Sequence, residues 1–400
     1  MRIEPFRPLV FRDIGSAVTS PPFDTISPEQ ERQLKSNPHN ISHLTLPGPD
    51  GPGESARLLR EWIREGVLVR MASDAVIVLQ QSFRMGHERI SRTGVICNVE
   101  VFPDRGDIIP HERTFEWAVQ ERLRVMEATG SHLEPIFLTV QNRNLERVLR
   151  RAMQASDPRE FEEPIGVMNS VHFVTDADMI REIQETLKHD RAVVADGHHR
   201  LEATRRLAAR AGTGCGSFWS RVMAYVTTIY DRGLLISGIH RVIVDAGPFS
   251  QYRKRMSDFF RMGTEGSVQR QDIMYVYDGQ FHSLEPTPAA LQIIESLGRQ
   301  ATPIELLSQV IMKRVLSIDE ERQPGAVRYT HDLSAAISSV DSKRASFSII
   351  MPPWNKEQFM AVVSSGHLLP QKSTYFYPKI PSGIAINGPQ EADTLRCGLP

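Results

Sequence analysis

The stretch Ala192-Val193-Val194-Ala195-Asp196-Gly197-His198-His199-Arg200 decides the fold of the chain around it. Residues 192–195 are small or apolar and include two β-branched valines, which predicts a short buried strand. Gly197 lets the backbone turn sharply and approach a ligand closely. Apolar residues at helical spacing then continue through residue 208, which predicts a helix. The expected local structure is therefore a strand, a tight turn and a helix.

The turn at residues 196–200 carries side chains that suit an anion. Asp196 is a favourable N-cap residue, and His198, His199 and Arg200 fall in the first helical turn. Unpaired backbone N–H groups and the helix dipole favour negative charge at that place. Two interpretations remain open from spacing alone: a phosphate-binding turn, or an ordinary capped helix with solvated histidines.

Composition bounds the class of protein. The chain has 400 residues, of which 40% are apolar and 24% are charged, as in soluble globular proteins of two or three domains. Its net charge of -1 provides no basic field for nucleic acid, so no nucleic-acid partner is expected. Cys97, Cys215 and Cys397 are far apart in sequence, which favours a reducing compartment over disulfides or a metal site.

The N-terminus has no apolar run of the kind a signal peptide needs, and no segment is apolar enough to span a bilayer. We therefore expect a cytoplasmic protein with no membrane partner. Its oligomeric state cannot be inferred from these features.

Periodicity predicts an α+β chain. Strands are expected over residues 41–46, 75–83, 90–102, 135–140, 171–174, 192–195, 222–229, 234–239 and 346–351, with helices over 55–65, 114–128, 144–153, 177–188, 289–297, 303–315 and 356–364. We expect a catalytic core over residues 1–245, a smaller and more helical region over 246–340, and a C-terminal segment over 341–400 that returns to the core.

Three further segments carry reactive side chains. His111 and Glu112 follow Pro110 at a strand-to-helix junction, and Arg241 is expected at the end of a strand. Residues 372–379 form an extended loop that contains Lys372, Ser373 and Thr374. Each also has a plainer interpretation, as a polar helix cap, a solvated charge or an exposed loop before an edge strand.

Glu112 supplies a carboxylate, the turn at residues 196–200 a phosphate-binding site, and Arg241 and Lys372 further positive charge. This combination suits phosphoryl transfer, in which positioning and charge neutralisation provide most of the catalysis. If Asp196, His198, Glu112 and His111 cluster instead, they would bind a divalent metal for hydrolysis. The sequence contains no Walker lysine loop, no strand-linked G-x-G-x-x-G, no H-E-x-x-H and no G-x-S-x-G.

Six elements occur in one order along the chain and together resemble a known family. They are Ser20-Pro21-Pro22-Phe23-Asp24, Asn37-Pro38 followed by His43, His111-Glu112-Arg113-Thr114, Ala195-Asp196-Gly197-His198-His199-Arg200, His240-Arg241 and Lys372-Ser373-Thr374-Tyr375-Phe376-Tyr377-Pro378-Lys379. This order resembles the domain of unknown function family 1015 of bacteria and archaea. The Asp-Gly-His-His-Arg segment is in turn similar to free-serine kinases of the ParB/sulfiredoxin-like superfamily.

The resemblance implies an α+β, mixed-sheet ParB/sulfiredoxin-like core that binds ATP or ADP with Mg²⁺. Carried over by position, Gly197, His198, His199 and Arg200 would hold the nucleotide phosphates, and Glu112, Asp196 and His199 would be catalytic. Asp196 would also be a tentative Mg²⁺ ligand. The substrate-binding residues implied in this way are His111, Arg241, Lys372, Ser373 and Thr374.

The expected activity is that of a nucleotide-dependent phosphotransferase with an alcohol acceptor, converting free L-serine or a serine-like hydroxyl compound to the O-phospho form. Two alternatives remain: a non-catalytic nucleotide-binding switch, and a metal-dependent hydrolase or nuclease. The chain departs from the family pattern at Phe23, where tyrosine is usual, and at Gln371, where proline is usual. Both departures bear on substrate identity more than on phosphate binding.

Overall fold

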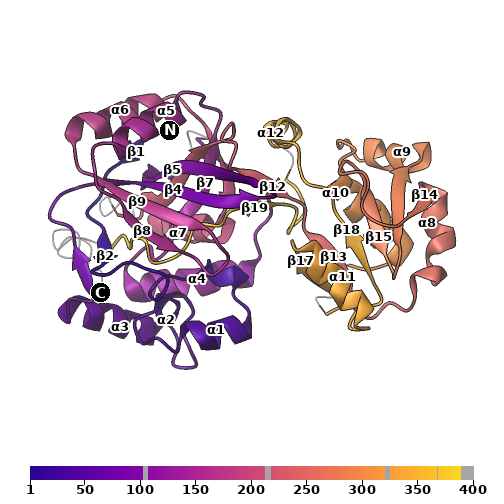
Figure 1. Cartoon of the computed structure of the whole chain (residues 1–400), viewed down its shortest axis with the longest axis horizontal. Helices are drawn as coiled ribbons and strands as arrows, with labels where there is room; N and C mark the ends of the chain where they lie inside the picture. Colours follow the sequence, from indigo (N-terminus) through magenta and orange to yellow (C-terminus); the bar gives the residue numbers. More distant parts are fainter. Residues whose placement is uncertain (102–106, 212–217, 320–324, 367, 389–400) are drawn as a thin grey trace. The chain divides into compact units, whose positions relative to one another are not determined.

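The computed structural model describes residues 1–101, 107–211, 218–319, 325–366 and 368–388. The chain divides into two compact units (Figure 1). Unit 1 comprises Met1–Pro110, Thr114–Leu235 and Pro378–Pro400, and unit 2 comprises His111–Arg113 and Ile236–Tyr377. Cys97 is buried in unit 1, whereas Cys215 and Cys397 lie outside the described residues.

Unit 1 is built on a nine-stranded mixed sheet. Its strands are β1 (Ile3–Glu4), β4 (Val76–Met85), β5 (Glu88–Glu100), β6 (Ile108–Ile109), β7 (Ile136–Val140), β8 (Arg159–Glu162), β9 (Met168–Val174), β10 (Ala192–Asp196) and β11 (Arg221–Thr228). The order is β6-β10-β7-β11-β5-β4-β9-β8, with β1 beside β5. The β10–β6 and β11–β7 pairs are parallel and the other pairs are antiparallel. The strands predicted over residues 75–83 and 90–102 are present as the antiparallel pair β4 and β5, and the expected mixed sheet is confirmed.

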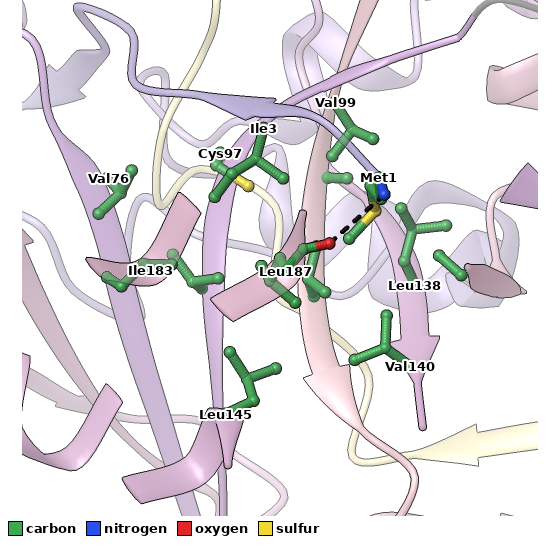
Figure 2. Close-up of a cluster of buried hydrophobic side chains, with 14 of the residues drawn as sticks. Met1, Ile3, Val76, Cys97, Val99, Leu138, Val140, Leu145, Ile183 and Leu187 are labelled. Atoms are coloured by element: carbon green, nitrogen blue, oxygen red, sulfur yellow. Dashed lines mark hydrogen bonds between the residues drawn. The ribbon is translucent and has the colours of Figure 1, made fainter. Parts of the chain in front are cut away.

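One face of this sheet forms the largest apolar cluster of unit 1. Alternate residues of the strands point toward α5 (Leu145–Met153) and α6 (Ala177–Leu187), whose apolar faces cover them. Figure 2 shows Ile183 and Leu187 of α6 among strand residues such as Val76, Cys97 and Leu138, with Met1 hydrogen-bonded to the Leu187 carbonyl. The residues that alternate with them point to the opposite face, which carries polar side chains such as Gln81 and Thr139 as well as apolar ones such as Ile77 and Phe137.

Further elements of unit 1 lie around this sheet. They are β2 (Leu9–Phe11), which pairs with β3 (Leu68–Arg70), the 3-10 turn η1 (Phe23–Thr25), and the helices α1 (Pro28–Leu34), α2 (Ser42–Thr45), α3 (Pro52–Arg64), α4 (Glu116–Thr129) and α7 (His198–Ala211). The prediction of a strand over residues 41–46 is wrong, because this segment forms α2. The Asn40 side chain accepts a hydrogen bond from Ser42 N and starts the helical turn, which buries Ile41 and Leu44 together.

The last described residues of the chain, 378–388, belong to unit 1. Isolated β-bridges join Ser382 to Ser20, Ile386 to Leu9, and Asn387 to His132. Lys379, which opens this segment, donates to Asp196 at 2.9 Å. The C-terminal segment therefore contributes to the same unit as the predicted phosphate turn.

Unit 2 contains a six-stranded antiparallel sheet. Its strands are β13 (His240–Ile243), β14 (Phe260–Glu265), β15 (Met274–Tyr277), β16 (Phe281–Pro286), β17 (Val327–Thr330) and β18 (Phe347–Ile350), in the order β14-β16-β15-β18-β13-β17. Both faces of the sheet are covered.

The other elements of unit 2 lie around this sheet. They are β12 (Leu235–Ser237), which pairs with β19 (Tyr375–Tyr377), the 3-10 turn η3 (Phe249–Gln251), and the helices α8 (Arg253–Phe259), α9 (Pro288–Ser296), α10 (Pro303–Glu305), π-helical η4 (Leu306–Leu316), α11 (Leu333–Asp341) and α12 (Lys356–Ser364).

The expectation of a mainly helical region over residues 246–340 needs correction. The predicted helices are present, but the same residues form four of the six strands of unit 2, namely β14 to β17. β14 and β17, at the two edges of the sheet, are mostly exposed or half-buried. Burial explains why β15 and β16 were missed: α8, α9 and η4 pack on one face of the sheet, and α11 packs on the other. A strand buried on both faces lacks the alternation that identifies strands in sequence. Residues 341–377 also belong to unit 2, and of the predicted returning segment only residues 378–388 are described in unit 1.

Among the described residues, none of the helices is both long and apolar enough to span a membrane.

A buried histidine of unit 1 makes its stability sensitive to acid. His132 packs against Phe218 and Trp219, and burial lowers its pKa to about 4, although a hydrogen bond to the Arg221 carbonyl opposes the shift. In the unfolded chain the pKa of the His132 imidazole is near 6.5, so the unfolded state binds the proton more readily than the folded state. We expect the free energy of unfolding to fall between pH 6.5 and pH 4, by up to about 3 kcal/mol from this group. Urea titrations of wild type and His132→Gln across this range measure it.

The variant should lose part of the pH dependence, whereas His87→Gln, in the exposed β4–β5 turn, should retain it. An identical slope for wild type and His132→Gln would contradict the assignment.

Candidate functional site

The predicted strand, turn and helix are present at residues 192–211. Strand β10 ends at Asp196, α7 begins at His198, and Gly197 between them has a φ of 89°. A Cβ atom on Gly197 would lie 2.8 Å from the Cγ2 atom of Ile136. The register of β10 against β7 also shifts between Val194 and Asp196, as at a β-bulge. The backbone of this turn therefore requires glycine.

Asp196 binds two cations, one with each carboxylate oxygen. Its Oδ1 atom accepts from Lys379 Nζ at 2.9 Å, and its Oδ2 atom accepts from Arg200 Nη2 at 3.2 Å. Burial alone would raise the pKa of this carboxyl, but the charges of Lys379, Arg200 and His198 outweigh burial and hold the pKa well below its usual value. Asp196 is therefore an ionised carboxylate that aligns Lys379 beside the turn.

Arg200 is buried, and its guanidinium faces inward. It donates to the Pro135 carbonyl at 2.6 Å as well as to Asp196, and it lies 3.9 Å from Glu134. Glu134 in turn accepts from the Ser382 hydroxyl and from the backbone N–H of Phe23. These contacts tie the start of α7 to the C-terminal segment.

The two histidines of the turn are half-buried. His199 Nε2 accepts a hydrogen bond from the backbone N–H of Phe115 at 3.1 Å, and the two rings are parallel, with centroids 6.3 Å apart. Because Nε2 accepts, the neutral ring carries its proton on Nδ1. His198 acts on the Asp196 carboxylate through its charge. The first turn of α7 therefore presents two imidazoles at the N-terminal end of the helix, where the helix dipole favours an anion.

The second group of predicted residues lies within unit 2. Glu112 Oε1 accepts from the backbone N–H groups of Ser373 and Thr374 at 3.1 and 3.2 Å, and from the Thr374 hydroxyl at 3.1 Å. His111 is buried, its Nε2 lies 2.9 Å from the same hydroxyl, and its ring packs edge-on against Phe359. The His-Glu junction and the Lys-Ser-Thr loop are thus brought together.

Arg241 lies at the start of β13, not at the end of a strand as expected. Its side chain is buried and donates to three carbonyls, those of Ile239, Gln371 and Lys372. This guanidinium holds the loop that carries Lys372, which has a left-handed φ of 55° and an exposed side chain. The arrangement assigns Arg241 a positioning role for that loop.

The structure thus gathers the predicted residues into two clusters. The turn at residues 196–200 lies in unit 1, and His111, Glu112, Arg241 and residues 372–374 lie in unit 2. Sequence reasoning missed roles for Lys379, Glu134 and Ser382. Lys379 stood in the quoted loop, but nothing in its spacing indicated Asp196 as its partner, 183 residues away.

The described part of the chain contains no group of three or more His, Cys, Asp or Glu side chains that could hold a metal ion. Both oxygens of Asp196 already bind cations, so its surroundings fit an ion-paired carboxylate and do not fit a Mg²⁺ ligand. An Mg²⁺ ion that arrives with a nucleotide would be held by phosphate oxygens.

A substitution at Gly197 tests whether the turn requires glycine. Alanine at this position meets both the unfavourable φ and the contact with Ile136. We expect Gly197→Ala to lower the free energy of unfolding by about 1–3 kcal/mol, measured by urea denaturation. Gly86→Ala, at a positive φ with no atom near the added methyl group, should cost less. Equal losses would show that the Ile136 contact does not matter.

A substitution at Lys379 tests its ion pair with Asp196. Lys379→Met removes one partner of the largely buried Asp196 carboxylate and should lower the free energy of unfolding by about 1–3 kcal/mol at pH 7. Because the pKa of Asp196 is depressed in the folded protein, its contribution is present above pH 3.8 and fades at lower pH. The loss should therefore shrink toward pH 3. Lys188→Met, in an exposed pair, should change little at any pH.

Comparisons with known proteins give a family and distant structural similarities. A conserved hypothetical protein from Pyrococcus furiosus is 13% identical, with 73% of this chain and 95% of that chain covered and a TM-score of 0.41. A free serine kinase in complex with AMP is 13% identical, with coverage of 70% and 86% and a TM-score of 0.40. SbnI with a C-terminal truncation, from Staphylococcus aureus, is 14% identical, with coverage of 75% and 92% and a TM-score of 0.41.

None of the curated proteins matches the chain. Residues 3–309 match the family described as "Protein of unknown function (DUF1015)". This match covers more than half of the 400 residues and includes five of the six motifs; the sixth, at residues 372–379, lies outside the matched range. The chain belongs to the DUF1015 family.

Proposed function

We propose that this protein is a nucleotide-dependent kinase of a small hydroxyl compound, with free L-serine as the first acceptor to test. The observation that carries the proposal is the turn from β10 to α7. There a glycine-dependent backbone places the N-terminal end of α7 beside His198 and His199, and Asp196 aligns the Lys379 ammonium with the same turn.

In this proposal the turn binds the nucleotide phosphates. The N–H groups of α7, the two imidazoles and Lys379 neutralise charge that develops on the transferred phosphoryl group. Asp196 does not touch the phosphates, because it is the counter-charge that fixes Lys379. Arg200 acts behind the turn as a positioning residue, since its guanidinium is engaged by Asp196 and the Pro135 carbonyl.

Glu112 is the carboxylate that we propose as the acceptor of the substrate proton. The hydroxyl oxygen forms a bond to the terminal phosphorus, the bond from that phosphorus to the nucleotide oxygen breaks, and the hydroxyl proton passes to the carboxylate. Three hydrogen bonds from residues 373 and 374 orient Glu112.

The first experiment is direct. Purified protein is incubated with Mg²⁺, L-serine and either ATP or ADP, and O-phosphoserine is measured by mass spectrometry. Product formation supports the proposal. Failure with L-serine and with a panel of other hydroxyl compounds would overturn it, and nucleotide binding without turnover would favour the switch alternative.

Glu112→Gln tests the role of the carboxylate. We expect turnover to fall by about 100-fold or more, because the amide cannot take the proton, while nucleotide affinity changes little. Nucleotide affinity is measured by calorimetry. Glu357→Gln, on the exposed side of α12, should leave both quantities unchanged. Loss of nucleotide binding in Glu112→Gln would remove Glu112 from the base role.

A further inference from the structure

A row of three aromatic rings leads outward from the turn at residues 196–200. The His199 ring lies parallel to the Phe115 ring, at an interplanar angle of 5° and with centroids 6.3 Å apart. The Phe115 ring in turn stacks with the Trp117 indole, at 26° and with centroids 5.9 Å apart. His199 belongs to α7, whereas Phe115 and Trp117 lie at the start of α4. All three belong to unit 1, so the row connects the proposed phosphate site to a side chain on the surface of that unit.

The outermost ring of this row is open to solvent. Trp117 is 67% exposed, the largest value among the exposed large apolar residues that the structure describes. Trp62 and Trp219 are buried and Trp354 is half-buried. Tryptophan is a residue whose large ring is usually well buried, because its removal from water is strongly favourable. An indole left open in this way is suited to a flat, partly apolar ligand.

The start of α4 holds the row in place before any ligand binds. The backbone N–H of Phe115 donates to His199 Nε2 at 3.1 Å, and Arg206 of α7 donates to both carboxylate oxygens of Glu116 at 2.6 and 2.9 Å. Apolar residues of α4 and α7 form one cluster behind these contacts. The first turns of the two helices are thus fixed to each other. A ligand that stacks on Trp117 would lose little free energy in ordering the protein.

The position of the indole matches the shape of a nucleotide. The proposed phosphate site is the N-terminal end of α7, beside His199, and two ring-to-ring steps of 6.3 and 5.9 Å lead from that imidazole to Trp117. In a nucleoside diphosphate a ribose separates the base from the phosphates, and the extended molecule spans a comparable distance. Aromatic side chains commonly bind bases by stacking, because every base has a π-face.

We propose that the Trp117 indole stacks on the purine base of the nucleotide whose phosphates bind at the turn, with Phe115 as the positioning residue that orients the indole. The inference rests on the proposed kinase function and adds a base-binding surface to it. A nucleoside phosphate combines an anionic end for the turn with a flat aromatic end for the indole. The fused rings of a purine overlap an indole more fully than a pyrimidine ring does, which favours a purine.

The test separates the base from the phosphates. Calorimetry measures the Kd of ADP and of inorganic pyrophosphate for the whole chain. Trp117→Ala should raise the Kd for ADP about tenfold or more, because the stacked face is lost, and should leave the Kd for pyrophosphate within about twofold of wild type. Trp117→Phe, which keeps a smaller ring, should raise the Kd for ADP less. Ile165→Ala, 62% exposed between β8 and β9 at the opposite edge of the sheet from α7, should bind both ligands as wild type does.

Fluorescence supplies a second readout that a merely structural role would not change. Trp117 is the exposed one of the four tryptophans, so acrylamide quenches its emission most readily. ADP should protect the emission of wild type from quenching, whereas pyrophosphate should not. Trp117→Phe should show no protection by ADP. Because the ring is exposed, both variants should unfold at nearly the same temperature as wild type.

Equal affinity for ADP in wild type and Trp117→Ala would overturn the inference, and so would equal rises in the Kd for ADP and for pyrophosphate. The kinase proposal fails separately. ADP binding that depends on Trp117, without phosphorylated product from any acceptor, would uphold the base-binding surface and reject the activity.

Discussion

The contact on which the rest of unit 1 depends is the pairing of Asp196 with Lys379 and Arg200. An ionised carboxylate in a largely buried place is stable only when cations and donors surround it. Lys379 comes from the C-terminal segment and Arg200 from α7, so one side chain at the end of β10 joins a strand, a helix and a distant part of the chain.

Two chains of contacts extend from this pairing. In the first, Arg200 lies 3.9 Å from Glu134, which also accepts hydrogen bonds from the Ser382 hydroxyl and from the backbone N–H of Phe23. Phe23 stands where tyrosine is usual in the family motif, and its ring packs under Arg122 with the Cζ atom 3.8 Å from the ring centroid. In the second, the carbonyl of Lys379 accepts a hydrogen bond from the Gln81 side chain, which in turn accepts one from Arg92. The motifs recognised in the sequence are thus the residues that bind one another.

Local features of the chain were predictable from the sequence, and long-range pairings were not. The turn at Gly197, the capping box at Ser27 and the hairpin of β4 and β5 each depend on residues close in sequence. In unit 2, β18 was predicted, whereas β15 and β16 were not, because strands buried on both faces lack the alternation that identifies a strand in sequence. The role of Lys379 was not predicted, because its partner Asp196 lies 183 residues away in the sequence.

The division of unit 1 into distant segments has a consequence for how the chain acquires its structure. Residues 378–388 bridge to Leu9, Ser20 and His132, and Ser382 bonds to Glu134 across 248 residues of sequence. During synthesis, the first 235 residues must wait for the whole of unit 2 to emerge before these bonds form. Until then Asp196 and Glu134 lack Lys379 and Ser382 as partners. The last contacts of unit 1 can therefore form only after unit 2 has been synthesised.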